Sequence, residues 1–410
     1  MPIRSSSHRS LACLTAGICF SIQALGVGTY IAFGVFFNPL METFGWSRAV
    51  IAGASSLAFL MMGVFGVLAG RLNDRFGPRP IMIVTALLMG LGCILMARLS
   101  APWELYLFYG IIFGMGGSSI DVIALTTVAR WFTHRRGFMT GVVKVGTGAG
   151  QFIIPLAAGW LILHYGWRMS FVVIGVVITS SLIIMARFLS RDPEAAGIAP
   201  PVSQPATTKT TLAAPLDIPL SSALRTVQLW TICLMNLFLV FCLLIVMMHI
   251  VPHARDLGVA PLKAAGVLST IGAISMLGRF CGGMVIDRRS SGTVMAVSFF
   301  LLLASLVWLQ FSDRTWMLYA FAVVYGLAHG GFFTAISPIV AEFFGIRFHG
   351  TLFGIVVFFG TAGGAIGPLM AGYLFDLSGS YQSTFRIITV MALVSCALFF
   401  SLKPFKKSLV

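Results

Sequence analysis

Charged side chains are scarce in this sequence of 410 residues. Asp, Glu, Lys and Arg make up only 10% of it, whereas hydrophobic residues make up 58%. Soluble proteins contain about a quarter charged residues and could not bury so much apolar surface. The composition therefore excludes a soluble protein and indicates a chain that crosses a lipid bilayer many times.

The sequence also lacks the motifs of several functional classes. It contains neither a GxxxxGK[ST] nucleotide loop nor a GxGxxG segment placed between a strand and a helix. It has no His-Cys or paired-carboxylate cluster typical of a membrane enzyme, and its seven cysteines lie in apolar segments without metal-ligand spacing. We therefore expect no enzyme activity, no cofactor and no metal site, and we interpret the cysteines as packing residues.

Apolar segments of about 20 residues, the length that a helix needs to cross a bilayer, recur along the sequence. We expect an all-α membrane protein with twelve transmembrane helices in two six-helix halves, residues 1–190 and 225–410. The polar segment 191–224 is rich in Pro, Ala, Ser and Thr, which is typical of a flexible cytoplasmic linker, with a short interfacial helix near its end. The predicted spans are 11–38, 48–70, 80–100, 103–130, 138–163, 168–190, 226–253, 261–286, 292–311, 315–343, 351–375 and 382–403.

The basic residues that give the chain its formal net charge of +15 are unevenly distributed along the sequence. With both termini inside, 18 Lys and Arg residues fall in cytoplasmic segments and 7 in outer segments. This asymmetry is the positive-inside pattern of membrane proteins, so it predicts orientation and not a nucleic-acid partner. We expect a multi-pass protein of the plasma (inner) membrane with cytoplasmic termini. The sequence does not indicate an oligomeric state.

The two predicted halves align on each other at a constant offset of 213 residues, which indicates an internal repeat. Glycines and prolines match across five helices without a gap. Parallel repeats of six spans resemble the architecture of the major facilitator superfamily. The alignment pairs Gly70, Asp74 and Arg75 with Gly283, Asp287 and Arg288.

The segment GRLNDRFGPRP at 70–80 resembles that superfamily's signature between its second and third helices, and GMVIDRR at 283–289 is a weaker copy. Gly70 permits close helix contact, and we expect Asp74 to pair with Arg75 across the cytoplasmic helix ends. Such a contact can break when the two halves rock against each other. The alternative interpretation is a basic turn that only fixes topology.

Ionisable residues inside membrane spans are costly and indicate function by default. Arg279 in the predicted eighth helix is the principal candidate, because its planar guanidinium suits a carboxylate and its repeat counterpart is Gly66. We expect it to bind the substrate. The alternative is that Arg279 extends to the cytoplasmic surface or pairs with Asp287 or Glu342.

Four other residues are candidates for proton coupling. Asp121 and Lys144 lie at similar depth, so they form either a neutralising pair or a site where one faces the cavity and changes protonation. His249 and His329 serve either as hydrogen-bonded packing residues or as proton carriers, because imidazole exchanges protons near neutral pH.

The sequence resembles one family in particular, the monocarboxylate transporters of lactate and pyruvate, with the oxalate–formate antiporters as neighbours. The similar segments are FGVFFNPLMETFGWSRA at 33–49, WFTHRRGFMTGVVKVG at 131–146, GIRFHGTLFG at 345–354 and GPLMAGYLFD at 367–376. The resemblance implies that Arg279 stands where the family's eighth helix has the arginine that binds the carboxylate. Further candidates to line the substrate site are Tyr30, Ser275, His329, Phe332, Phe333 and Phe359.

The sequence departs from that family at two positions linked to proton coupling. Ser275 stands where mammalian members have an aspartate, and Ile31 lies near the place of a lysine. The predicted eleventh helix has no Lys or Arg, so one dependable cation favours a monoanion unless Lys144 also faces the cavity. We expect a proton-coupled symporter of L-lactate or pyruvate. The alternatives are an organic-anion antiporter of the oxalate–formate type, a multidrug effluxer and a membrane sensor.

Overall fold

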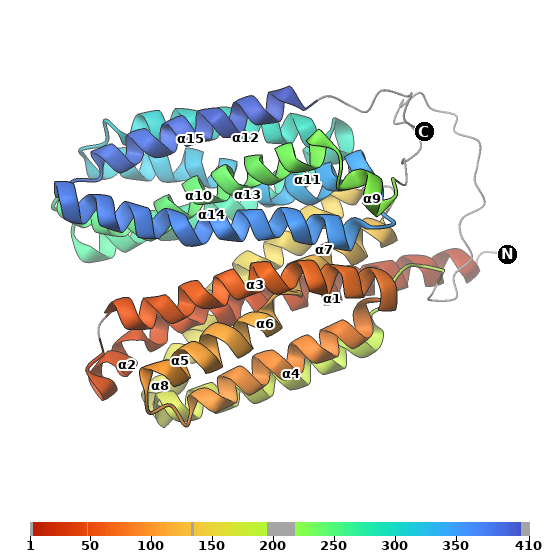
Figure 1. Ribbon diagram of the computed structural model, residues 1–410, viewed down its shortest axis with the longest axis horizontal. Helices are drawn as coiled ribbons and strands as arrows, with labels where there is room; N and C mark the ends of the chain where they lie inside the picture. The colour runs from red at the N-terminus through yellow and green to blue at the C-terminus, as the bar shows by residue number, and fades with distance from the viewer. Residues whose placement is uncertain (1–2, 47, 133–134, 195–217, 403–410) are drawn as a thin grey trace.

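The computed structural model describes residues 3–46, 48–132, 135–194 and 218–402, and these form helices joined by short turns (Figure 1). Most of the predicted linker 191–224 lies outside the described residues. The short helix α9 (Leu220–Ala223) lies at its end.

The first half of the chain contains the helices drawn from red to yellow-green in Figure 1. Its fourth span consists of several pieces, including a π-helical segment, where the sequence predicts one continuous helix. The elements are α1 (Ile3–Ala32), a 3₁₀ turn (Phe33–Phe36), α2 (Phe37–Phe44), α3 (Arg48–Phe76), α4 (Pro78–Met96), α5 (Pro102–Leu105), the π-helical segment (Tyr106–Phe113), α6 (Gly114–Gly117), α7 (Ile120–Trp131) and α8 (Arg136–Phe188).

Helix α8 contains two membrane spans. Its 53 residues would extend about 80 Å at 1.5 Å per residue, far more than a bilayer core of about 30 Å. Gly166, with φ 73° and ψ 163°, breaks the helix in a region of backbone space that favours glycine. Eleven described helices are long and apolar enough to cross a membrane, and the division of α8 gives the predicted twelve spans.

The second half forms a separate layer of six helices, drawn from green to blue in Figure 1. Helix starts follow local sequence signals: the Thr226 side chain accepts a hydrogen bond from Leu229 N at the start of α10, and Pro261 opens α11. The six helices are α10 (Val227–Asp256), α11 (Pro261–Arg288), α12 (Ser291–Leu309), α13 (Thr315–Phe344), α14 (His349–Ser378) and α15 (Gln382–Ser401).

The two halves pack against each other through glycines. We call the end of the bundle where α1 begins and α15 ends the terminal end (Figure 1). There a Cβ on Gly70 of α3 would lie 2.1 Å from the Gly350 carbonyl oxygen of α14. A Cβ on Gly283 of α11 would lie 2.6 Å from the Gly137 carbonyl oxygen of α8. These two contacts are equivalent under the 213-residue repeat, so glycine permits the same close approach on both sides of the interface.

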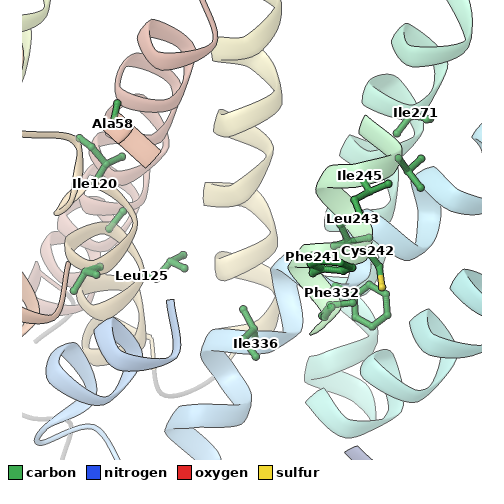
Figure 2. Packing of buried hydrophobic residues seen from close by; sticks show 14 of the residues in the cluster. Ala58, Ile120, Leu125, Phe241, Cys242, Leu243, Ile245, Ile271, Phe332 and Ile336 are labelled. Atoms are coloured by element: carbon green, nitrogen blue, oxygen red, sulfur yellow. The ribbon is translucent and has the colours of Figure 1, made fainter. Parts of the chain in front are cut away.

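Some side chains far from the terminal end are exposed: Leu163, just before the bend in α8, is 85% accessible, and Leu377, near the end of α14, is 68% accessible. The buried apolar side chains fill both halves: Figure 2 shows Ile120 near Ala58 in the first half and Phe332 near Cys242 in the second. Close packing between the halves is not confined to the terminal end, since Gly63 of α3 approaches Thr361 of α14 as closely.

All seven cysteines are free thiols. Four of them, Cys19, Cys93, Cys233 and Cys242, are buried as packing residues. The interpretation is wrong for Cys13 and Cys281, which are exposed, because an apolar span has a lipid-facing side as well as a packed side.

Candidate functional site

Arg279 lies on α11 and reaches across to the other half of the protein. Its Nη1 donates a hydrogen bond to the Lys144 carbonyl oxygen of α8 over 3.1 Å. The residue is only 4% exposed, and its buried Nε has no hydrogen-bond partner among the described residues. No described carboxylate is close enough to form an ion pair with it. Arg279 therefore retains capacity for an anionic ligand.

The alternative partners of Arg279 are engaged elsewhere. Asp287 accepts hydrogen bonds from the backbone of α8, and Glu342 accepts one from the Ser291 hydroxyl. The alternative in which Arg279 pairs with one of these acids is therefore wrong. A guanidinium that is buried without a carboxylate is costly, which favours a role in binding.

Small residues bring α13 against α11 beside this arginine. A Cβ on Gly330 would lie 2.3 Å from the Ser275 carbonyl oxygen and 2.7 Å from Arg279 N. This close packing places His329 Nδ1 2.9 Å from the Ser275 hydroxyl. Ser275 and His329, both predicted site residues, therefore lie together next to Arg279.

Asp121 and Lys144 form an ion pair inside the first half, with Nζ 2.6 Å from Oδ1. The same Oδ1 accepts a second hydrogen bond, over 2.7 Å, from Gln23 Nε2 of α1. Thr147 of α8 donates to Gln23 Oε1 over 2.9 Å. The pair is thus held by a network that joins α1, α7 and α8.

Phe333 connects the two halves of the site. Lys144 Nζ lies 5.8 Å from the centre of its ring and Arg279 Cζ lies 5.9 Å from the same centre. Both cations are therefore within cation–π distance of one aromatic side chain. With Asp121 ionised, the three charged groups carry a net charge of +1, which suits a single carboxylate.

Three predicted site residues lie elsewhere. Phe332 is buried against Phe299 of α12, with ring centroids 4.8 Å apart, and Phe359 packs on Trp230 of α10. Tyr30 stacks on Phe59, and it lies about 10 Å along α1 from Gln23. In this structure these three side chains make ring contacts within their own halves. Their assignment to substrate binding stays a prediction.

His249 is held between three helices. A carbonyl can only accept, so Nε2 carries the proton that it donates to Pro368 O over 3.1 Å, and Nδ1 lies 3.1 Å from the Tyr381 hydroxyl. Both ring nitrogens are engaged, as the packing alternative expects. A role of His249 in proton coupling stays a prediction.

The predicted Asp74–Arg75 pair does not form. Asp74 binds Arg130 of α7 at 2.7 Å, while Arg75 is exposed and stacks over Phe76. Asp74 also accepts hydrogen bonds from Gly350 N, Thr351 N and the Thr351 hydroxyl at the start of α14, over 3.1, 2.8 and 2.8 Å. The prediction named the wrong partner, because adjacent residues on a helix project about 100° apart.

Asp287 makes the equivalent contact in the other half. Its carboxylate accepts from Gly137 N and Phe138 N, at the start of α8, over 2.7 and 3.1 Å. Arg288 is exposed. Carboxylates stabilise the positive N-terminal end of a helix, so each half caps a helix of the other at the terminal end. Both sets of hydrogen bonds must break if the halves separate there.

Sequence reasoning missed Gln23, Thr147, Arg130 and Thr351. A neutral polar residue inside a span gives little signal, because many such side chains bond to their own helix, as Thr15 does to Leu11 O. No group of three His, Cys, Asp or Glu residues that could hold a metal occurs in the part of the chain that the structure describes.

Two six-helix halves with a buried ionic site and matched contacts at one end are the architecture of a membrane transporter built from parallel repeats. The family model described as Major Facilitator Superfamily matches residues 17–313 and 282–410, and the chain belongs to this superfamily. Its members are transporters and not enzymes.

Curated relatives cover nearly the whole chain. It is 25% identical over 388 residues to "Monocarboxylate transporter 13" of Bos taurus, with 94% of this chain and 88% of that protein covered. It is 26% identical over 388 residues to "Monocarboxylate transporter 11" of Homo sapiens, with 91% and 79% covered. It is 26% identical over 387 residues to "Monocarboxylate transporter 4" of Rattus norvegicus, with 92% and 80% covered.

Two solved structures share the fold. The Major Facilitator Superfamily transporter FucP in the outward conformation matches with a TM-score of 0.72 at 16% identity, covering 94% of this chain and 97% of that one. The proton:xylose symporter XylE matches with a TM-score of 0.71 at 14% identity, covering 98% and 97%.

Proposed function

We propose that this chain is a secondary active transporter that carries a small monocarboxylate, L-lactate or pyruvate, together with a proton. Transport takes place across the plasma membrane by alternating access, with the termini in the cytoplasm. The observation that carries the proposal is the buried Arg279 guanidinium, which no described carboxylate neutralises.

The chemistry of the surrounding residues supports a small organic acid. The carboxylate binds the guanidinium, which offers a planar pair of donors and stays charged. Phe333 and the apolar faces of α11 and α13 suit a short carbon body. The names of the curated relatives agree with this substrate class.

The contacts between the halves support alternating access. Asp74 and Asp287 hold the terminal end closed in this structure by capping α14 and α8. With both caps in place, we assign this structure a state that is closed at the terminal end. Breaking the two caps opens the site toward the cytoplasm.

No observation favours exchange of the oxalate–formate type. A dianion is best balanced by two free cations, and as long as Asp121 is ionised it neutralises Lys144 at 2.6 Å. The cluster charge of +1 and the relatives both favour a monoanion over a dianion.

Reconstituted vesicles provide the test. Labelled L-lactate and a panel of carboxylates from two to six carbons are offered to the purified protein, with and without an alkaline interior. The expected result is accumulation of short monocarboxylates that the pH gradient accelerates. Uptake that ignores the gradient contradicts proton symport, and a lack of uptake for every acid contradicts the substrate class.

A further inference from the structure

One oxygen of the Asp121 carboxylate carries the whole hydrogen-bond network around it. Lys144 Nζ and Gln23 Nε2 both bind Oδ1, and among the described residues no bond to Oδ2 is observed. The Asp121 side chain is 34% exposed, whereas that of Lys144 is 5% exposed. Because Oδ1 already accepts two hydrogen bonds and the side chain is partly exposed, we take Oδ2 as the oxygen that is available to a proton.

We propose that Asp121 is the residue that takes up the coupled proton. When Asp121 is protonated, Lys144 forms an ion pair with the substrate carboxylate instead of with Asp121. This inference rests on the proposed function. It selects one carrier among Asp121, Lys144, His249 and His329, and it gives Lys144 a role in binding.

The reason is the cost of a buried charge without a counterion. When Oδ2 gains a proton, the O–H bond forms there and the carboxylate loses its charge, so the buried Lys144 ammonium loses its partner. A substrate carboxylate placed near Phe333 restores that partner, because the ring lies 5.8 Å from Lys144 Nζ and 5.9 Å from Arg279 Cζ. Protonation thus favours anion binding, and by linkage anion binding favours protonation.

The groups that face Asp121 allow this exchange. Two cations lie near Asp121, namely Lys144 of α8 and Arg279 of α11. His329 of α13 lies on the other side of Phe333, and Gln23 of α1 is neutral. On α3, α4 and α14 the described charged residues lie near the helix ends, as Asp74, Arg79 and His349 do. With the proton and one monocarboxylate bound, the cluster keeps the net charge of +1 that it has when empty, so the cargo is electroneutral.

Gln23 is a positioning residue in this scheme. Its amide accepts from Thr147 and donates to Asp121 Oδ1, which holds Oδ1 in place and leaves Oδ2 without a bond among the described residues. Replacement by leucine removes a donor that stabilises the ionised carboxylate. Gln23→Leu is therefore expected to move the pH midpoint of substrate binding upward while the pH dependence itself remains, a result that loss of packing alone does not produce.

The test is the affinity of purified full-length protein for L-lactate across pH 5 to 9, with proton uptake recorded by a pH-indicator dye in weak buffer. For the wild type, affinity is expected to fall about tenfold per pH unit above the midpoint, with uptake of about one proton per lactate bound. Asp121→Asn, which mimics the protonated carboxyl group, is expected to bind with an affinity that does not change with pH and without proton uptake. Glu42→Gln, which changes an exposed acid on α2 in the same way, is the matched control and is expected to behave as the wild type.

Each outcome supports or overturns the inference. Wild-type binding that is independent of pH and takes up no proton overturns it, whatever the variants do. If Asp121→Asn folds and keeps the wild-type pH dependence, or if His329→Gln removes that dependence instead, the assignment to Asp121 is wrong. If the wild type binds neither L-lactate nor any acid of the panel, the proposed function fails and this inference fails with it.

Discussion

Replacing Arg279 with glutamine removes the cation that we assign to the substrate carboxylate. The side chain is buried and its guanidinium has no ion-pair partner among the described residues. Truncating one partner of a buried, hydrogen-bonded charge pair costs about 2–5 kcal/mol. That range corresponds to a loss of roughly 30- to 4,000-fold in affinity for L-lactate.

The fold is expected to tolerate this change. Arg279→Gln removes a buried charge that has no ion-pair partner among the described residues. Among these residues, the only side-chain hydrogen bond that the change removes is the one from Arg279 to Lys144 O. Thermal unfolding in detergent is therefore expected at the wild-type temperature or above it. Arg279→Lys keeps the charge without the planar fork and is expected to lose less affinity than Arg279→Gln.

The assay is calorimetric titration of L-lactate into purified protein, with uptake into vesicles as a second readout. Arg255→Gln, which changes an exposed arginine on α10, is the matched control and is expected to bind as the wild type. If Arg279→Gln binds L-lactate within about threefold of a wild type that does bind it, Arg279 is not the carboxylate ligand.

Three further changes test the gate and the histidine. Gly70→Leu places side-chain atoms where a Cβ alone would lie 2.1 Å from Gly350 O, so we expect the terminal end to stay open and transport to stop. Gly17 has open space around it, so the control variant Gly17→Leu is expected to transport normally. Asp74→Asn removes the charge that caps α14 and is expected to shift the closed state by about 1–3 kcal/mol toward open, measured as a longer distance between spin labels at positions 71 and 347. His249→Leu loses two hydrogen bonds, so a lower unfolding temperature with an unaltered pH dependence of uptake is expected. An unchanged label distance for Asp74→Asn, or lost pH dependence for His249→Leu, contradicts these assignments.

Features that depend on composition and repetition could be predicted from the sequence. The twelve spans follow from runs of apolar residues, since each must match the bilayer thickness whatever its neighbours are. The break at Gly166 and the start at Pro261 follow from backbone restrictions of single residues. The 213-residue repeat also predicted that Gly70 and Gly283 hold equivalent positions, and both lie in close contacts between the halves.

Predictions of partners were less reliable. Asp74 was expected to bind Arg75 and instead binds Arg130 and the start of α14. Phe332 and Phe333 are adjacent, yet one packs on α12 and the other lies near Lys144 and Arg279. Neighbouring helix residues point about 100° apart, so the face of a residue depends on how its helix is rotated against the others.

The sequence by itself determined that the protein is a twelve-span repeat with an isolated buried cation at Arg279, because hydropathy, spacing and the absence of an acid nearby on the same helix are properties of the linear chain. Only the tertiary structure decided what surrounds that cation. Gln23, 98 residues before Asp121, meets the Asp121–Lys144 pair of two consecutive helices because helix packing brings the three side chains together. The tertiary structure also decided that, among the described residues, only one oxygen of Asp121 accepts hydrogen bonds, since bond directions are fixed only when every partner is in place.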